Sequence, residues 1–227
     1  MNINVLTNEI IRVQEQFAVE IVDKSEQLRE VFRLRHQVYC VERGYEPGAD
    51  GEESDEFDCR SRHVLVRHLE DGTALGTVRV IMPNFINLRD SFPMQRLCDP
   101  SLLRDLPLHT TGEMSRFAIS KHRRMSCSSA MLLRLALWRG ILQLSGEMGL
   151  THWLAIVEPS NIRLHARHSI CFDSVGPLVS YHGVRQPTVG VVQPVLDHIR
   201  REAFPVWDFI TNGGLLAGRQ QRLAEVA

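Results

Sequence analysis

Apolar and polar residues recur along the chain with two periods, and these periods predict a mixed α/β fold. Short apolar runs rich in β-branched residues indicate strands, whereas apolar residues repeated every three to four positions indicate helices. Strands are predicted at residues 17–22, 63–69, 74–82, 112–119, 151–157, 175–181 and 189–195. Helices are predicted at residues 25–41, 126–146 and 162–170. Helices that alternate with strands in this way are typical of an α/β sheet with mixed strand directions.

The strand predicted at residues 112–119 contains two charged side chains, Glu113 and Arg116. A charge in a buried strand needs a partner or a function. Side chains three residues apart on a regular strand point to opposite faces. A bulge between them would re-aim one side chain, and it would provide backbone N–H groups for a developing negative charge. The alternative is an ion pair with another residue that serves only the structure.

The first predicted helix places an arginine on its apolar stripe. Leu28, Phe32, Arg35 and Tyr39 follow one another at i, i+4, i+7 and i+11, which is one face of a helix. The guanidinium group of Arg35 is therefore expected either inside the protein or at the edge of the stripe, with its head in solvent.

Residues 43–62 form an acidic segment between this helix and the next strand. Its five acidic residues in the centre are Glu52, Glu53, Asp55, Glu56 and Asp58. Such a segment is usually a solvated loop. Tyr45 and Phe57 favour a loop that folds over a cationic or amine-bearing ligand. Because the carboxylates repel one another, we expect the loop to be mobile until a ligand, or Arg35 brought near by one, relieves the repulsion.

A basic turn precedes the long helix. Arg123 and Arg124 are followed by Ser126, Ser128 and Ser129, any of which can cap the helix. The first turn of a helix offers free N–H groups and the positive end of the helix dipole, so a phosphate group would bind there. The alternative is a basic turn exposed to solvent.

His165, His168 and Cys171 follow one another at intervals of three residues. Only the two histidines have a spacing suited to a shared metal ion on a helix, and no carboxylate lies close to them in sequence. We therefore expect no metal site.

The chain has 227 residues and a formal net charge of -1, with 26 basic and 27 acidic residues. This length suits one domain, expected at residues 18–214, with an arm at residues 1–17 and a tail at residues 215–227. A nearly neutral chain gives no electrostatic reason to bind nucleic acid. The chain has five cysteines and no C-x-x-C pair, and its N-terminal stretch is unlike a signal peptide, so we expect a cytoplasmic protein. It has no long apolar run, so we expect no integral membrane segment.

Several motifs, in this order along the chain, resemble those of the acyl-homoserine-lactone synthase family. They are Arg35 with Tyr39 and Tyr45, Glu53-x-Asp55-x-x-Asp58, Gly76-Thr77-Val78-Arg79 and Glu113-Met114-Ser115-Arg116-Phe117-Ala118. That family has phenylalanine where Tyr39 stands and tryptophan where Tyr45 stands. The second half is more similar to the PEP-CTERM/exosortase-associated acyltransferases, which are close to the long-chain N-acyl amino acid synthases. The segments that carry this similarity are residues 32–40, 151–160 and 176–183.

The resemblance implies a GNAT-like α/β fold, with a mixed, mostly antiparallel sheet and helices on both faces. It also implies an enzyme that moves a fatty acyl group from an acyl carrier protein thioester to the α-amine of an amino acid. Glu113 is the expected base, and Arg79 and Arg116 complete the expected catalytic group. The expected acceptor-binding residues are Arg35, Tyr39, Tyr45, Glu53, Asp55 and Asp58. The expected residues for the acyl-pantetheine donor are Phe117, Ala118, Ile119, Arg123, Arg124 and Trp153.

Arg35 and Arg79 are expected to hold the carboxylate of the acceptor. The expected partners are acyl carrier protein and a small amine, and acyl-phosphopantetheine is a co-substrate rather than a bound cofactor. The chain has no glycine between Ser120 and Ala130, so it lacks the glycine-rich loop with which GNAT enzymes bind the pyrophosphate of coenzyme A. Two other functions stay open. One is an acyl-homoserine-lactone synthase that uses S-adenosylmethionine, and the other is a non-catalytic GNAT-like module that senses a ligand or binds a partner protein.

Overall fold

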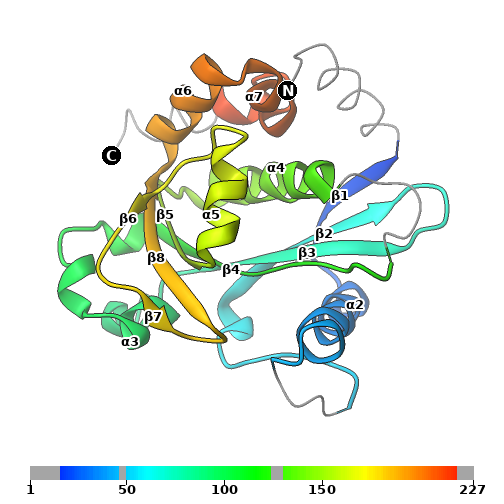
Figure 1. Ribbon diagram of the computed structural model, residues 1–227, viewed down its shortest axis with the longest axis horizontal. Coiled ribbons are helices and arrows are strands. Elements are labelled where there is room, and N and C mark those ends of the chain that lie inside the picture. Colours follow the sequence, from blue (N-terminus) through cyan, green and yellow to red (C-terminus); the bar gives the residue numbers. More distant parts are fainter. Residues whose placement is uncertain (1–15, 46–49, 124–129, 219–227) are drawn as a thin grey trace. The chain divides into compact units, whose positions relative to one another are not determined.

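The computed structural model describes residues 16–45, 50–123 and 130–218 (Figure 1). The chain divides into two compact units. The first unit contains residues 1–79 and 116–142, and the second contains residues 80–115 and 143–227. Most of the predicted arm and tail lies outside the described residues, so the domain boundaries after residues 17 and 214 stay predictions.

Eight strands form the sheet within the described residues, in the order β1-β2-β3-β4-β5-β8-β6, and β7 pairs with β8. The strands are β1 (Phe17–Ile21), β2 (Ser61–His68), β3 (Ala74–Ile81), β4 (Thr111–Ile119), β5 (His152–Val157), β6 (Asp173–Ser174), β7 (Val179–Ser180) and β8 (Val184–Val191). β1 pairs with β2 in an antiparallel manner, and β5, β6 and β7 each do so with β8. β4 and β5 are parallel. The predicted mixed sheet is therefore confirmed.

Helices connect the strands. The longer ones are α2 (Ser25–His36), α4 (Ala130–Met148) and α6 (Val192–Glu202), and the shorter ones are α3 (Pro93–Leu97), α5 (Pro159–Ala166) and α7 (Phe204–Thr211). A π-helix, η1 (Gln37–Glu42), continues directly from α2. Short 3-10 turns are η2 (Asp58–Arg60), η3 (Leu88–Asp90), η4 (Pro100–Leu103) and η5 (Leu108–Thr110).

Helices cover both faces of the strands of the first unit. Val64 and Leu65 are neighbours in β2, so their side chains point to opposite faces. Leu65 belongs to a buried cluster with Val31 and Leu34 of α2. The side chain of Val64 lies against Gly140 of α4, where an added Cβ would come within 2.3 Å of it. α2 and α4 therefore pack on opposite faces of this part of the sheet, as Figure 1 shows.

The strand predicted at residues 189–195 is wrong in its second half, because β8 ends at Val191 and α6 begins at Val192. Pro194 cannot donate a hydrogen bond to a neighbouring strand but fits the first turn of a helix. Val192, Val195 and Ile199 recur at the helical period and are buried. The strand predicted at residues 175–181 is reduced to the two residues of β7.

Candidate active site

Strand β4 departs from regular geometry at the expected place. Residues Thr111 to Met114 pair with His152 to Ala155 of β5. Two residues further on, Arg116 has a φ of 52°, in the left-handed region that a strand residue rarely adopts. A left-handed residue within a strand is a feature of one class of β-bulge. The strand is therefore irregular at Arg116, and a bulge at this place would re-aim one of the two charged side chains.

Glu113 is a buried carboxylate with a fixed orientation. Its side chain is 2% exposed, and its Oε2 accepts a hydrogen bond of 3.0 Å from the backbone N–H of Met94. Met94 lies in the first turn of α3, where backbone N–H groups have no partner within the helix. The carboxylate also acts on its surroundings, because burial and the nearby Glu113 charge together raise the pKa of the Cys98 thiol. Glu113 is thus an oriented acceptor of a proton or a hydrogen bond.

In the first unit, three arginines and three carboxylates form a closed ring of alternating charge. We call this set the charge ring. Its members, in order round the ring, are Arg35, Glu53, Arg116, Asp55, Arg79 and Asp58. The structure thereby brings together residues from α2, β3, β4 and the acidic segment. The three positive and three negative charges cancel, so the ring as a whole is neutral.

The contacts of the charge ring are short and directional. Arg79 binds both carboxylate oxygens of Asp55, with 2.7 Å between Nη2 and Oδ2, and its Nη1 lies 2.7 Å from Oδ1 of Asp58. Arg35 places Nη1 at 2.6 Å from the same oxygen of Asp58, and its Nε donates to Glu53. Arg116 donates from Nε to Oε1 of Glu53 over 2.9 Å. Charge-assisted pairs of this kind are among the strongest hydrogen bonds in proteins.

The carboxylates of the charge ring are held in their ionised form. Burial alone would raise the pKa of each of them, but the hydrogen bonds and charges of the arginines lower it by more. The pKa of Asp58 falls to about 2. The acids are therefore ionised at neutral pH without any ligand.

The premise of mutual repulsion in the acidic segment is wrong. Glu53, Asp55 and Asp58 are each bound by arginines in the ligand-free protein. Glu52 forms a more exposed pair with Arg33, at 3.4 Å. The sequence does not show that arginines from distant strands reach these carboxylates. Residues 46–49 of the segment lie outside the described residues.

Arg35 and Arg79 have protein partners where the acceptor carboxylate was expected. Both terminal nitrogens of Arg79 bind Asp55. Arg35 uses Nε and Nη1, and its Nη2 is a buried donor without a hydrogen-bond partner among the described residues. Only this nitrogen of Arg35 is left to bind an acceptor without breaking the charge ring.

His63 lies beside the charge ring and was not among the predicted site residues. Its side chain is 3% exposed, and Nε2 is 3.8 Å from Oδ1 of Asp58. Neither ring nitrogen has a hydrogen-bond partner within the described part of the chain. Burial lowers the pKa of His63 to about 4, so the imidazole is neutral at neutral pH. Alternation along β2 offered a signal, because it places His63 on the same face as Leu65.

Tyr39 connects the π-helix η1 to β4. Its hydroxyl donates to the backbone oxygen of Phe117 over 3.4 Å, and the guanidinium of Arg116 lies over its ring at 5.5 Å. Burial raises the pKa of the Tyr39 phenol, so it stays protonated. Tyr45 lies close by, with a ring centroid 6.4 Å from that of Tyr39. The predicted acceptor-binding residues on the helix and in the acidic segment are thus neighbours in the structure.

The comparison with protein-family models matches residues 30–192 to the model described as N-acyl amino acid synthase FeeM. The match spans more than half of the chain. The chain belongs to the FeeM family of N-acyl amino acid synthases. Members of this family are acyltransferases, so the protein is an enzyme of that class. No curated protein sequence matches the chain.

Several solved structures have a similar fold. FeeM itself, an N-acyl amino acid synthase from uncultured soil microbes, is 13% identical with a TM-score of 0.61, and the match covers 83% of this chain and 97% of that one. The coenzyme A-dependent acyl-homoserine lactone synthase BjaI is 19% identical with a TM-score of 0.62, covering 88% and 99%. The acyl-homoserine lactone synthase LasI is 20% identical with a TM-score of 0.58, covering 76% and 87%. At such identities the likeness shows the fold, and it confirms the predicted fold class.

The residues expected at the donor side of this family member are only partly described. Phe117, Ala118 and Ile119 form the end of β4. Arg123 donates from Nη1 to the backbone oxygen of Ala74 over 3.4 Å. Arg124 and the predicted helix start at Ser126 lie outside the described residues.

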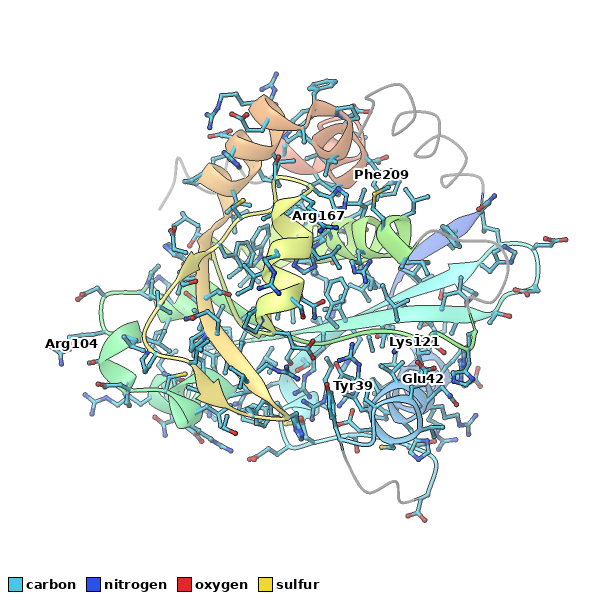
Figure 2. All side chains as sticks on the ribbon, in the orientation of Figure 1. Tyr39, Glu42, Arg104, Lys121, Arg167 and Phe209 are labelled. Atoms are coloured by element: carbon cyan, nitrogen blue, oxygen red, sulfur yellow. The ribbon has the colours of Figure 1, made fainter. Side chains whose placement is uncertain are left out.

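The predicted phosphate site, the helix start after Ser126, lies outside the described residues, but the turn that precedes it has backbone N–H groups that already bind a carboxylate. The carboxylate of Glu42, at the end of η1, accepts a hydrogen bond of 2.9 Å from the backbone N–H of Lys121. Figure 2 shows these two residues next to each other. Glu42 was not predicted as a site residue, because its charge looks like one more solvated side chain at the end of a helix.

Trp153 of β5 is packed in the second unit. It is 2% exposed, its Nε1 donates to Ser145 over 2.8 Å, and its ring lies 5.9 Å from that of Phe172. This satisfied, buried position is that of a core residue. A role for Trp153 in donor binding therefore stays a prediction.

Within the described ranges, no group of three or more His, Cys, Asp or Glu side chains is arranged to hold a metal ion. The same residues include no helix with the length and apolar character that crossing a membrane requires.

Proposed function

We propose that the protein transfers a fatty acyl group from an acyl carrier protein thioester to the α-amine of an amino acid. The observation that carries the reaction is the buried carboxylate of Glu113, oriented by Met94 just before the backbone of β4 departs from strand geometry. An oriented carboxylate next to an irregular backbone provides the two functions that aminolysis of a thioester needs. These are a proton acceptor and donors for a negative oxygen.

The proposed reaction begins with the amine of the acceptor in its neutral form. The amine nitrogen attacks the thioester carbonyl, and a proton passes from nitrogen to Glu113, directly or through one water molecule. The carbonyl oxygen becomes negative in the tetrahedral intermediate, and backbone N–H groups of the distorted part of β4 stabilise it. The C–S bond then breaks, the amide forms and the pantetheine thiol leaves with the proton.

The charge ring supports this proposal on the acceptor side. It holds the acidic segment against α2, β3 and β4 without leaving a net charge, so its main role is to position Tyr39 and the buried Nη2 of Arg35. That nitrogen is suited to one oxygen of the acceptor's carboxylate. Arg79 and Arg116 thus act as positioning residues in the proposed site.

The donor is proposed to be carrier-bound because a phosphopantetheine arm has one phosphate and needs no glycine-rich pyrophosphate loop. The chain has no glycine between Ser120 and Ala130. A cytoplasmic location and a place among the PEP-CTERM/exosortase-associated acyltransferases belong to the same proposal. They rest on the cysteine usage and on the motifs of the second half.

The test is a direct assay of product formation. The protein is incubated with acyl carrier protein thioesters of several chain lengths, a mixture of amino acids and S-adenosylmethionine, and a parallel set contains acyl coenzyme A. Mass spectrometry is expected to find an N-acyl amino acid in the carrier protein set. An acyl-homoserine lactone, product only with coenzyme A, or no product at all would each contradict the proposal.

A further inference from the structure

Glu42 occupies a concentrated group of hydrogen-bond donors directly after β4. The hydroxyl of Ser120 donates to Oε1 over 2.6 Å, and the backbone N–H of Lys121 donates to Oε2 over 2.9 Å. The backbone N–H of His122 lies 3.5 Å from Oε1. Successive backbone N–H groups that face one acceptor make an anion-binding concavity. Here the bound anion is a carboxylate of the protein itself.

The carboxylate is ionised, and the donors that hold it are close to solvent. Burial alone would raise the pKa of Glu42, but the hydrogen bonds from Ser120, Lys121 and His122 lower it by more. Ser120 is buried, whereas Lys121 and His122 are exposed and Glu42 is half-buried. An anion from solvent can therefore reach the same N–H groups if the side chain of Glu42 moves away.

We propose that Glu42 is a displaceable lock. In the free enzyme it fills the anion site formed by Ser120, Lys121 and His122, and the phosphate of the donor's pantetheine arm takes its place. This inference rests on the proposed function, which requires a phosphopantetheine donor. A phosphate group brings more negative charge and more acceptor oxygens than a carboxylate, so it competes for the same donors.

The lock connects the donor to the acceptor side through η1. Glu42 is the last residue of this π-helix, which also carries Tyr39. Tyr39 anchors η1 to Phe117, and its backbone oxygen accepts a hydrogen bond of 2.8 Å from the N–H of Tyr45. Release of Glu42 removes one anchor of η1 and lets the helix adjust around the acceptor. Because coupling between two binding sites is reciprocal, the acceptor then also strengthens binding of the donor phosphate.

The lock can be distinguished from a permanent clamp, because the two make opposite predictions. If Glu42 only held the turn in shape, its removal would disorder the anion site and weaken phosphate binding. If Glu42 competes with the phosphate, its removal strengthens binding. A site that is open about a tenth of the time binds its ligand about tenfold more weakly than an open site.

The experiment measures binding of 4′-phosphopantetheine by calorimetry, with pantetheine as the ligand that lacks the phosphate. The variants are Glu42→Gln, which keeps the shape, and Glu42→Ala, which removes every acceptor oxygen. Glu70→Gln, in the exposed turn after β2, is the matched control. We expect about tenfold tighter binding of 4′-phosphopantetheine by Glu42→Ala, a smaller gain for Glu42→Gln, and no change for the control. Pantetheine is expected to bind all four proteins alike.

A second measurement locates the phosphate. The backbone amide NMR signals of Lys121 and His122 are expected to shift when 4′-phosphopantetheine is added to the folded wild-type protein. Unchanged or weaker binding by both Glu42 variants, or amide signals that do not respond, would overturn the lock. Neither measurement needs turnover. A confirmed lock in a protein that forms no N-acyl amino acid would therefore leave this inference standing while the proposed function fails.

Discussion

Glu113 is the residue to which the proposed chemistry assigns the proton transfer. β4 contains no other acidic side chain, and this one is buried, with an N–H donor on one oxygen. Its hydrogen bond to Met94 also gives it a structural role, because it ties α3 to the strand. A substitution must therefore separate loss of a base from loss of a contact.

Glu113→Gln is expected to lower kcat by about 10²- to 10⁴-fold, the usual contribution of general acid–base catalysis. The amide keeps an oxygen that can accept the hydrogen bond from Met94 but cannot take a proton. Steady-state kinetics and thermal unfolding are measured together, with Glu147→Gln on the exposed side of α4 as the control. Turnover close to that of the wild type would rule out Glu113 as the base.

His63 is a second single residue with a measurable effect, because its low pKa makes the free energy of unfolding depend on pH. The unfolded chain takes up a proton on this imidazole near pH 6.5, whereas the folded protein does so only at about pH 4. Between these values the unfolded state binds more protons, so the free energy of unfolding falls as the pH falls. Below about pH 4 the imidazole is protonated in both states, so the contribution of His63 to the free energy of unfolding no longer changes with pH.

His63→Phe is expected to flatten this part of the stability profile. The lost dependence amounts to about 3 kcal/mol between pH 6.5 and 4, as an order of magnitude, from the difference between the two pKa values. Urea unfolding at a series of pH values measures it, with His109→Gln in an exposed position as the control. A profile of unchanged slope in His63→Phe would contradict the low pKa.

At the scale of elements, the charge ring determines how the acidic segment is held. Breaking a buried ion pair by removing one partner is costly, because the other charge stays buried. Asp58 receives Arg35, Arg79 and the backbone N–H of Asp55, so it is the central acceptor of the segment. We therefore expect that order at residues 50–60 does not depend on the acceptor.

Asp58→Asn is expected to lower the free energy of unfolding by about 3 kcal/mol, with faster hydrogen exchange at residues 50–60. The pKa of Asp58 is about 2, below its ordinary value of 3.8, so the lost stability is present above about pH 4 in the wild type and disappears as the pH falls through 2. Asp71→Asn, in the exposed turn before β3, is the control. If the segment exchanges slowly only after an amino acid is added, the charge ring does not order it.

The helical period predicted correctly that Arg35 lies on the apolar stripe of α2, because Leu28 and Phe32 share this stripe, and the structure shows that its side chain is buried. It did not predict the partners of Arg35. Glu53 and Asp58 lie 18 and 23 residues further along the chain, and their pairing is decided by the packing of the sheet. The contacts of Glu42 with Ser120, Lys121 and His122 escaped prediction for the same reason, since these residues lie 78 to 80 positions away. The periodicity of the sequence predicts which face of a helix or strand is buried. Contacts between segments that are distant in sequence can be found only once the fold is known.

At the scale of the whole molecule, a net charge of -1 leaves no general attraction for an acidic carrier protein. Recognition of such a partner must come from a local basic surface. The turn after β4 provides one in the sequence, with Lys121, Arg123 and Arg124 close together. Screening by salt limits such an interaction to groups within about 8–10 Å at physiological ionic strength.

Charge reversal at Arg123 and Arg124 is therefore expected to raise the KM for the acyl carrier protein thioester by about tenfold or more, with little change in the KM for the amino acid. The effect on the carrier is expected to shrink as salt is added, because the lost attraction is electrostatic. Charge reversal at Arg89 and Arg104, both exposed and in the second unit, is the matched control for net charge.

An equal rise in KM for both double variants would show an effect of overall charge, and an unchanged KM in the Arg123 and Arg124 variant would place the carrier elsewhere. An equal rise in KM for a small acyl-4′-phosphopantetheine thioester, which has the phosphate but no carrier protein, would instead assign these arginines to the phosphate rather than to the surface of the carrier.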